Sequence, residues 1–160
     1  MSTRFARVVA VFAALALVGA GVALAAAVTV KSAKNPTYGR LVVNSSGFTL
    51  YHNTKEKGSI KCTGSCAKIW PPLYVGKTQK VKAGPGINLT KLGKIKRPNG
   101  RFQVTYAGKP LYRYSGDTKA GTVNGEGIGG IWFAIKANGA LAKAPVGTTT
   151  NTTTTTTTGY

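Results

Sequence analysis

The sequence predicts a mostly β fold, organised as one small antiparallel, sheet-rich domain. Three observations lead to this prediction. Short strand patterns alternate with turns, and beyond the N-terminal segment no stretch sustains the periodicity of an amphipathic helix. Glycine supplies 21 of the 160 residues, as expected of a chain with many tight turns. An internal repeat divides the folded region into two similar hairpin-containing units.

The strand patterns begin with a hairpin in which the turn Asn44–Gly47 separates two apolar runs. Residues 102–106 alternate between apolar and polar side chains, which indicates a strand with one buried face. Pro110 opens the next strand, because proline fits only at a strand start or on an edge. Pro71 limits any helix to one or two turns around residues 65–69. The expected strands are residues 40–43, 48–52, 101–106, 110–114 and 131–135.

The N-terminus has the pattern of a targeting segment. Arg4 and Arg7 precede an apolar run over residues 8–30, and Ala23-Leu24-Ala25 offers small residues for cleavage. This combination is typical of an export signal. Because the run is also about long enough to cross a bilayer, an uncleaved membrane anchor is the alternative. In either case residues 1–27 place the remainder outside the cytoplasm, secreted or associated with the cell envelope.

The rest of the chain divides by composition. Residues 28–38 are expected to form a short basic linker, and residues 39–137 the β domain. Its two units span about 39–75 and 92–137 and are joined by a basic loop. Residues 138–160 are expected to form a small-residue connector followed by a threonine-rich tail. The tail, from residue 148 on, has almost no apolar side chains to bury, so it is expected to be disordered. That tail is either a glycosylated or wall-embedded stalk or a segment without a role.

The repeat is visible when Gly47-Phe-Thr-Leu-Tyr51 is set beside Gly108-Lys-Pro-Leu-Tyr112. In each unit an acid follows the tyrosine, and a tryptophan follows the acid. A unit of this size hardly buries a core alone, so the two units are expected to share one core with approximate two-fold symmetry. The repeat residues are Leu50, Tyr51, Glu56 and Trp70 in the first unit, and Leu111, Tyr112, Tyr114, Asp117 and Trp132 in the second.

The acids of the repeat, Glu56 and Asp117, are two of only three in the chain. A carboxylate placed after a strand can accept hydrogen bonds from turn N–H groups or pair with a lysine or arginine. A structural role is therefore expected for both, with a ligand-binding role of the tyrosine–acid pairs as the alternative.

Two motifs point to a family. Residues 112–117 fit the pattern Tyr-x-aromatic-x-x-Asp, and Cys62-Thr-Gly-Ser-Cys66-Ala-Lys-Ile-Trp70-Pro-Pro fits a Cys-x-Gly-x-Cys-Ala-x-x-Trp-Pro-Pro signature. Residues 39–136 thus resemble the predicted bacterial lipoproteins with a conserved Yx(FWY)xxD motif, also described as a secreted repeat of unknown function. The first repeat departs from the pattern at Asn53 and Glu56, and the lipobox cysteine of many members is absent. The resemblance implies an exported protein and no established activity.

Cys62 and Cys66 are the only cysteines. In an exported protein such a pair most simply forms a disulfide, here fixing the turn that delivers Trp70 to the core. The alternative is a redox-active or metal-binding pair, because flanking lysines could lower a thiol pKa. His52, the only histidine, is interpreted as a surface residue at a strand end.

Charge excludes several function classes. The chain has 22 Lys and Arg against 3 Asp and Glu, a formal net charge of +19. Most hydrolytic chemistry requires a histidine or two placed carboxylates, so no enzyme activity is predicted, and neither a metal site nor a cofactor is expected. The densest basic stretch, expected to contact polyanions, contains Lys77, Lys80, Lys82, Lys91, Lys94, Lys96, Arg97 and Arg101.

The sequence therefore favours a monomeric, non-catalytic cell-envelope module that associates with anionic wall polymers or lipid head groups through a basic face. Sequence-specific nucleic-acid binding is not expected, because no known nucleic-acid-binding pattern occurs. Two alternatives stay open: an extracytoplasmic thiol redox or electron-transfer protein that uses Cys62 and Cys66, and a purely structural envelope protein.

Overall fold

The structure is a computed structural model that describes residues 27–143. These residues form a mostly β fold with one short α-helix, as the sequence predicts. The strands are β1 (Thr29–Asn35), β2 (Gly39–Asn44), β3 (Tyr51–Asn53), β4 (Tyr74–Val75), β5 (Lys82–Ala83), β6 (Leu92–Lys96), β7 (Phe102–Tyr106), β8 (Lys109–Pro110) and β9 (Trp132–Ala134). The helices are α1 (Gly64–Ile69) and the 3₁₀ turns η1 (Leu89–Lys91) and η2 (Ile128–Gly130).

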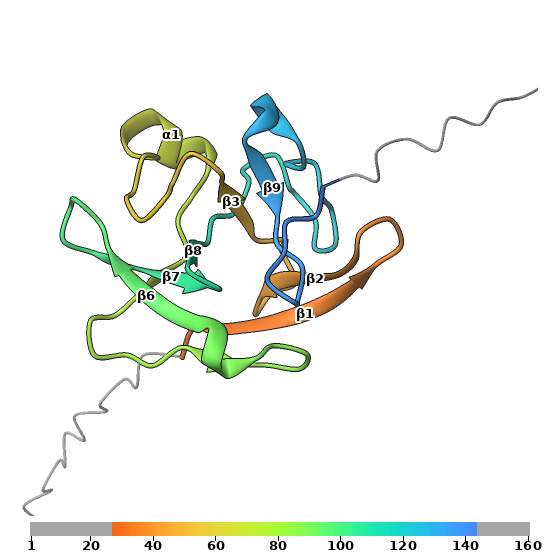
Figure 1. Cartoon of the computed structure of the whole chain (residues 1–160), viewed down its shortest axis with the longest axis horizontal. Coiled ribbons are helices and arrows are strands. Elements are labelled where there is room, and N and C mark those ends of the chain that lie inside the picture. The colour runs from red at the N-terminus through yellow and green to blue at the C-terminus, as the bar shows by residue number, and fades with distance from the viewer. Residues whose placement is uncertain (1–26, 144–160) are drawn as a thin grey trace, which may run out of the picture.

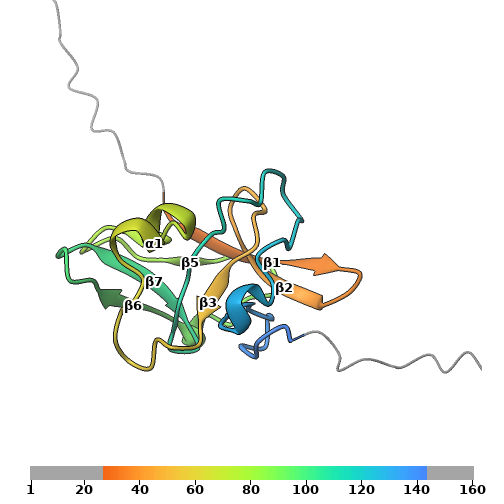
Figure 2. The same cartoon turned by 90° about the horizontal axis from the view of Figure 1, so that it is seen from above.

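The strands form three small sheets. The first has the order β2-β1-β5, with β1 and β2 antiparallel and β1 and β5 parallel. The second pairs β3 with β9, and the third has the order β4-β7-β6 with β8 also pairing β7. Figures 1 and 2 show the β1–β2 hairpin and the β6–β7 hairpin on opposite sides of the molecule, with β3 between them.

Glycines at matching positions shape the turns of the two units. Gly47 has φ +86° and Gly108 has φ +74°, in the left-handed region that favours glycine. Ala107 precedes Gly108 with φ +50°, so two successive positive φ angles join β7 to β8 in a tight hairpin. The glycine that opens each repeat is therefore required by the turn that leads into the Leu-Tyr pair.

Three backbone hydrogen bonds recur in the two units. Leu50 N donates to Val42 O and Leu111 N donates to Val104 O, at 2.9 and 3.0 Å. The other two cross between the units. In the first unit Val42 N donates to Ile135 O and Ile135 N to Leu50 O, whereas in the second Val104 N donates to Leu73 O and Leu73 N to Leu111 O. In each unit, the backbone segment that completes the pairing therefore comes from the other unit: Ile135 for the first and Leu73 for the second.

The core is shared for the same reason. One cluster combines Val30, Val42, Leu50 and Val75 with Val104, Tyr106, Leu111 and Ile135. A second cluster combines Leu41, Tyr51, Cys62 and Trp70 with Tyr112, Trp132, Ala134 and Ala142. Both clusters draw side chains from both units, so the apolar area that stabilises the fold exists only when the two halves meet.

Two expectations are wrong. The segment expected as a basic linker contains β1, which pairs with β2 from Val30–Asn44 to Asn35–Gly39 and buries Val30 completely. The lysines of this segment made its composition resemble that of a linker, so the strand was not predicted. β7 was expected to have one polar, exposed face, yet Gln103 and Thr105 are buried too. The export segment and the threonine-rich tail lie outside the described residues, apart from residue 27.

Candidate functional site

The repeat tyrosines and acids meet in two crossed pairs. The Tyr51 hydroxyl donates to Asp117 Oδ2 at 2.6 Å, and the Tyr112 hydroxyl donates to Glu56 Oε1 at 2.8 Å. Each tyrosine thus binds the acid of the other unit. Tyr51 and Tyr112 also exchange backbone N–H···O bonds with one another, at 2.8 and 2.9 Å. We call the two pairs the Tyr51 junction and the Tyr112 junction.

Both tyrosines are held in the protonated, donating form. Burial raises the pKa of Tyr51, and its hydrogen bond to the Asp117 carboxylate raises it further. The pKa of Tyr112 is likewise raised by burial and then by Glu56. A buried phenol that already donates to a carboxylate satisfies both groups. This geometry supports a structural role for the pairs.

The tryptophans of the two units stack on one another. The Trp70 and Trp132 rings are parallel within 3°, with centroids 3.9 Å apart. Tyr51 meets Trp70 edge-on at 5.5 Å, and Tyr112 meets Trp132 edge-on at 5.2 Å. Tyr114 adds a tilted contact with Trp70 at 4.5 Å. Together with buried Leu50 and Leu111, the structure brings all nine repeat residues into the shared core region.

The three carboxylates bind internal donors. Glu56 Oε1 accepts the N–H groups of Lys61 and Cys62, at 2.8 and 2.9 Å, besides the Tyr112 hydroxyl. Asp117 Oδ1 accepts the N–H of Asn124 at 2.9 Å, and Glu126 Oε2 accepts that of Ala134 at 2.7 Å. Burial raises the pKa of Glu126, a shift that the Ala134 bond opposes. The acids therefore organise loops within the domain.

Cys62 and Cys66 form the disulfide that the spacing favours, with their Cα atoms 5.2 Å apart. The bridge joins the loop before α1 to the helix itself, and Trp70 follows directly at the helix end. Cys62 is buried at 1 % exposure, and its N–H is one of the donors to Glu56. The disulfide loop is thus part of the Tyr112 junction.

The interpretation of His52 as a surface residue is wrong. Its side chain is 6 % exposed, because β3 pairs with β9 and places His52 opposite Phe133. Burial lowers the pKa of His52, while a hydrogen bond with the Pro110 backbone opposes the shift. His52 lies at the end of a strand in the sequence, but in the fold β9 of the other unit pairs with that strand and covers His52.

The eight predicted polyanion contacts are distributed over several elements and differ in their surroundings. Lys82 belongs to β5 in the first sheet, and Lys91 Nζ donates to Asn138 O at 2.5 Å. Lys94 Nζ donates to the Lys77 and Gln79 carbonyls, so Lys94 and Lys77 do lie together. Lys80 shares a shallow cavity with Lys94, and Lys96 lines another.

Arg97 is the clear exception among the eight. It is 3 % exposed and donates to the Gln103 side chain, the Cys62 carbonyl and the Tyr112 hydroxyl. The expectation that Arg97 lies on the exposed basic face is therefore wrong. The charge density of the stretch indicated a surface face, whereas the turn after β6 carries Arg97 inward toward Tyr112.

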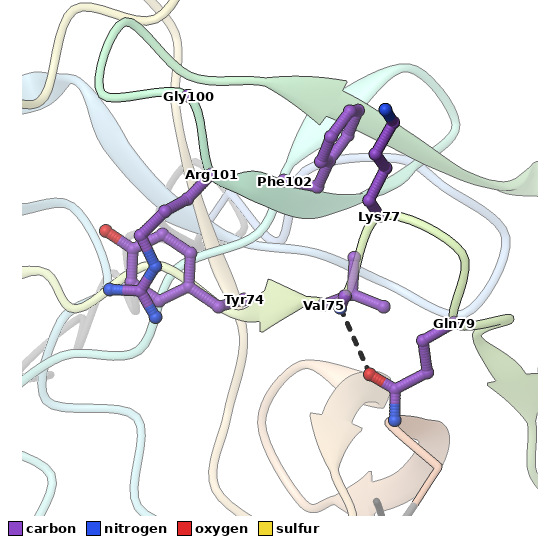
Figure 3. A pocket seen from close by; sticks show the side chains of 8 residues that line it. Tyr74, Val75, Lys77, Gln79, Gly100, Arg101 and Phe102 are labelled. Carbon is purple, nitrogen blue, oxygen red and sulfur yellow. Dashed lines mark hydrogen bonds between the residues drawn. The ribbon is translucent and has the colours of Figure 1, made fainter.

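Two cavities flank Tyr74, a residue that sequence reasoning missed. The first, about 440 Å³, is lined by Tyr74, Lys77, Arg101, Phe102 and neighbours on β4 and β7. Figure 3 shows the Arg101 guanidinium over the Tyr74 ring at one end and Lys77 and Phe102 at the other. Arg101 Cζ is 3.3 Å from the ring centroid of Tyr74. No repeat motif covers Tyr74; only the pairing of β4 with β7 brings it beside Arg101.

The second cavity, about 380 Å³, lies on the Arg97 side of Tyr74. It is lined by Tyr74, Arg97, Asn99 and Thr63, with the remaining walls from the disulfide loop, α1 and Pro98. The Arg97 guanidinium carbon is 5.9 Å from the Tyr74 ring centroid. Tyr74 therefore separates two recesses, each of which contains an arginine.

Across residues 27–143 no group of three or more His, Cys, Asp or Glu side chains is placed to hold a metal ion. Nor does this stretch contain a helix with the length and apolar character needed to cross a membrane.

Fold and site together define a disulfide-bonded β domain in which two copies of a tyrosine–acid–tryptophan motif interlock. Residues 93–136, in the second unit, match the model of a lipoprotein family described as a secreted repeat of unknown function. The match confirms the resemblance for the second unit, which contains the Tyr-x-aromatic-x-x-Asp motif, and the family's description suggests an extracytoplasmic location. Searches of the curated proteins and of the solved structures found no match.

Proposed function

We propose that this protein is a non-catalytic cell-envelope module that associates with anionic wall polymers or lipid head groups through its basic surface. The observation that carries the proposal is the division of charge between interior and surface. Glu56 and Asp117 are buried, and Glu126 is half-buried with its carboxylate bound to a backbone N–H. The acids are therefore turned away from the surface that the lysines cover.

The resulting field is positive over most of the domain. Without Arg4 and Arg7 the chain has 20 basic residues against 3 acids, a formal charge of 20 − 3 = +17. Most lysines of the densest basic stretch are exposed, namely Lys77, Lys80, Lys82, Lys94 and Lys96. Such a surface attracts polyanions by releasing their counterions, so binding should weaken as salt rises.

The proposed function includes a symmetric arrangement of the two repeat units. We infer that the two units are related by an approximate two-fold axis near the Tyr51–Tyr112 backbone pair. The crossed junctions and the recurring hydrogen bonds support this relation. A rigid, disulfide-bonded scaffold of this kind presents its lysines in a fixed arrangement, which suits a binding module more than a catalyst.

Binding to isolated bacterial cell envelopes tests the proposal. The mature protein is mixed with envelopes, and the bound fraction after sedimentation is measured over a series of salt concentrations. Binding should fall steeply and log-linearly with salt. A variant with Lys80, Lys82 and Lys96 replaced by glutamine should bind less and show a shallower salt slope. Binding that does not respond to salt, or no binding at low salt, would contradict the proposal.

The redox alternative gives a different result in the same preparation. Replacing Cys62 and Cys66 by serine should leave the salt-dependent binding intact once folding has been verified. If the pair instead exchanges thiols with an oxidoreductase partner, the protein isolated from its native envelope will contain a fraction of free thiol. The buried Cys62 and its bond to Glu56 favour the structural disulfide.

A further inference from the structure

We propose that the two recesses on either side of Tyr74 form one binding site for a phosphodiester-linked polymer, with Arg101 and Lys77 in the first recess and Arg97 in the second. This inference rests on the proposed function and names the part of the basic surface that recognises the polymer and the class of polymer it takes.

The first recess combines cations with aromatic faces. Arg101 is exposed and lies over Tyr74, which orients its planar guanidinium while leaving its edge available to an anion. Lys77 lines the same recess, and Lys94 holds the Lys77 segment through the Lys77 carbonyl at 2.8 Å. Phe102 offers half-buried apolar area to the carbon skeleton between anionic groups.

The second recess contains Arg97, a buried cation whose hydrogen-bonding groups are not all paired within the fold. Arg97 lines it and is 3 % exposed, and its Nε has no hydrogen-bond partner among the described residues. Arg97 is linked to the Glu56 carboxylate through the Tyr112 hydroxyl rather than by a direct hydrogen bond among those found. A buried guanidinium with an unpaired N–H binds an anion more strongly than an exposed lysine does. Asn99 and Thr63 add polar groups to the same walls.

Shape favours a polymer over a bilayer. A bilayer presents a broad, nearly flat array of head groups, which meets exposed lysines more readily than a cation that is only 3 % exposed, as Arg97 is. A flexible chain can place one phosphate beside Arg101 and another beside Arg97, with Tyr74 between them. The first recess has a volume of about 440 Å³ and the second about 380 Å³, which is enough for a short segment of a polymer chain.

The test measures affinity of the mature full chain for three probes at fixed ionic strength, by isothermal titration calorimetry or sedimentation. The probes are a synthetic glycerol-phosphate oligomer, free orthophosphate, and vesicles that contain phosphatidylglycerol. The oligomer and the lipid both present glycerol-phosphate groups. In the oligomer these groups are linked in a chain, whereas in the vesicle they lie side by side on a surface. We expect the oligomer to bind more tightly than either of the other probes.

Two pairs of variants locate the site. In the first recess K77Q/R101Q is compared with K34Q/K119Q, which removes the same charge from exposed positions elsewhere. We expect about tenfold weaker oligomer binding for the former and about twofold for the latter. In the second recess T63E is compared with T118E. The Thr63 side chain makes no capping hydrogen bond, so the fold should tolerate the change, and we expect about fivefold weaker binding for T63E alone.

Equal losses in site and control variants would overturn the site and leave the proposed function standing. Tight binding to vesicles without binding to the oligomer would replace the polymer with a membrane surface. Orthophosphate binding as tightly as the oligomer would reduce the site to a single anion pocket. If none of the three probes binds, both this inference and the proposed function fail.

Discussion

The two tyrosine–acid junctions use the same motif in different surroundings. At the Tyr51 junction the hydroxyl accepts the N–H of Gly125 at 3.3 Å, and Asp117 binds one further backbone N–H. At the Tyr112 junction the hydroxyl accepts from Arg97 at 3.2 Å, and Glu56 binds the backbone N–H groups of Lys61 and the disulfide-bonded Cys62. Backbone donors thus suffice to hold one buried pair, and the guanidinium is present only at the other.

The comparison shows which parts of the motif serve the fold. Both junctions keep the tyrosine, the carboxylate, a backbone donor and a stacked tryptophan. Arg97 and the disulfide are specific to the Tyr112 junction, which faces the second recess beside Tyr74. The shared parts hold both buried junctions together, and the parts found only at the Tyr112 junction are where a ligand-binding role is to be sought.

Removing the carboxylates should have the largest effect. Glu56→Ala leaves three donors unpaired, the buried Tyr112 hydroxyl and Cys62 N–H and the half-buried Lys61 N–H, and is expected to lower the free energy of unfolding by about 5 kcal/mol. Asp117→Ala leaves the buried Tyr51 hydroxyl and the half-buried Asn124 N–H unpaired and is expected to cost about 3 kcal/mol. Urea unfolding followed by tryptophan fluorescence measures both. Glu126→Ala, which frees a single backbone N–H, is the control and should cost about 1 to 2 kcal/mol. Equal losses for Glu56 and Asp117 would show that the extra donors of the Tyr112 junction contribute nothing.

Alkaline pH should destabilise both junctions. The pKa of each buried tyrosine is raised in the folded state, so the full contribution is present below about pH 10, where an unfolded tyrosine also keeps its proton. Above that pH the unfolded chain releases the proton first, and stability falls by about 1.4 kcal/mol per pH unit for each tyrosine. Urea unfolding between about pH 8 and 11, with tyrosinate absorbance, measures the slope.

Single variants separate the two tyrosines in that experiment. Tyr51→Phe and Tyr112→Phe should each remove part of the alkaline slope. Because both tyrosines stay protonated in the folded state over this pH range, the two variants should remove equal parts of the slope. An unchanged slope in both variants would mean that other groups cause the alkaline loss.

Removing the disulfide should weaken one junction only. The Cys62→Ser/Cys66→Ser variant is expected to lose about 2 kcal/mol, since the closed loop is short. The Tyr112 contribution to the alkaline slope should shrink, because the Cys62 N–H and C=O bind Glu56 and Arg97. The Tyr51 contribution should persist. A reduction potential below about −300 mV is expected for the native bridge, and a value in the oxidoreductase range would favour the redox alternative.

Acidic pH should have the smallest effect, and His52 is the group expected to cause the loss of stability. Burial lowers its pKa in the folded state, so its contribution is complete above about pH 6.5 and is lost as pH falls below that value. The loss cannot exceed about 1.4 kcal/mol per pH unit. Unfolding curves between about pH 7.5 and 5 measure it, with His52→Gln as the matched variant. A stability profile that is identical in this variant would rule His52 out as the cause.

Local pattern was sufficient for much of the fold. The turn at Asn44–Gly47, the alternation in residues 102–106 and the position of Pro71 predicted β2, β7 and the short helix within one or two residues. The repeat predicted a core shared by both units, because neither unit has enough apolar residues to bury one alone. β1 was not predicted because its lysine-rich composition is typical of a linker. Its strand character becomes evident only from its pairing with β2.

The amino-acid order alone determined the repeat, the cysteine pair and the large positive charge, since each depends only on residue type and spacing. Only the tertiary structure decided that each tyrosine binds the acid of the opposite unit, that His52 and Arg97 are buried, and that Tyr74 separates two recesses. Those outcomes depend on contacts between segments far apart in the chain, such as β3 with β9 and β4 with β7. A side chain's neighbours, and with them its charge environment, are determined only when those segments pack.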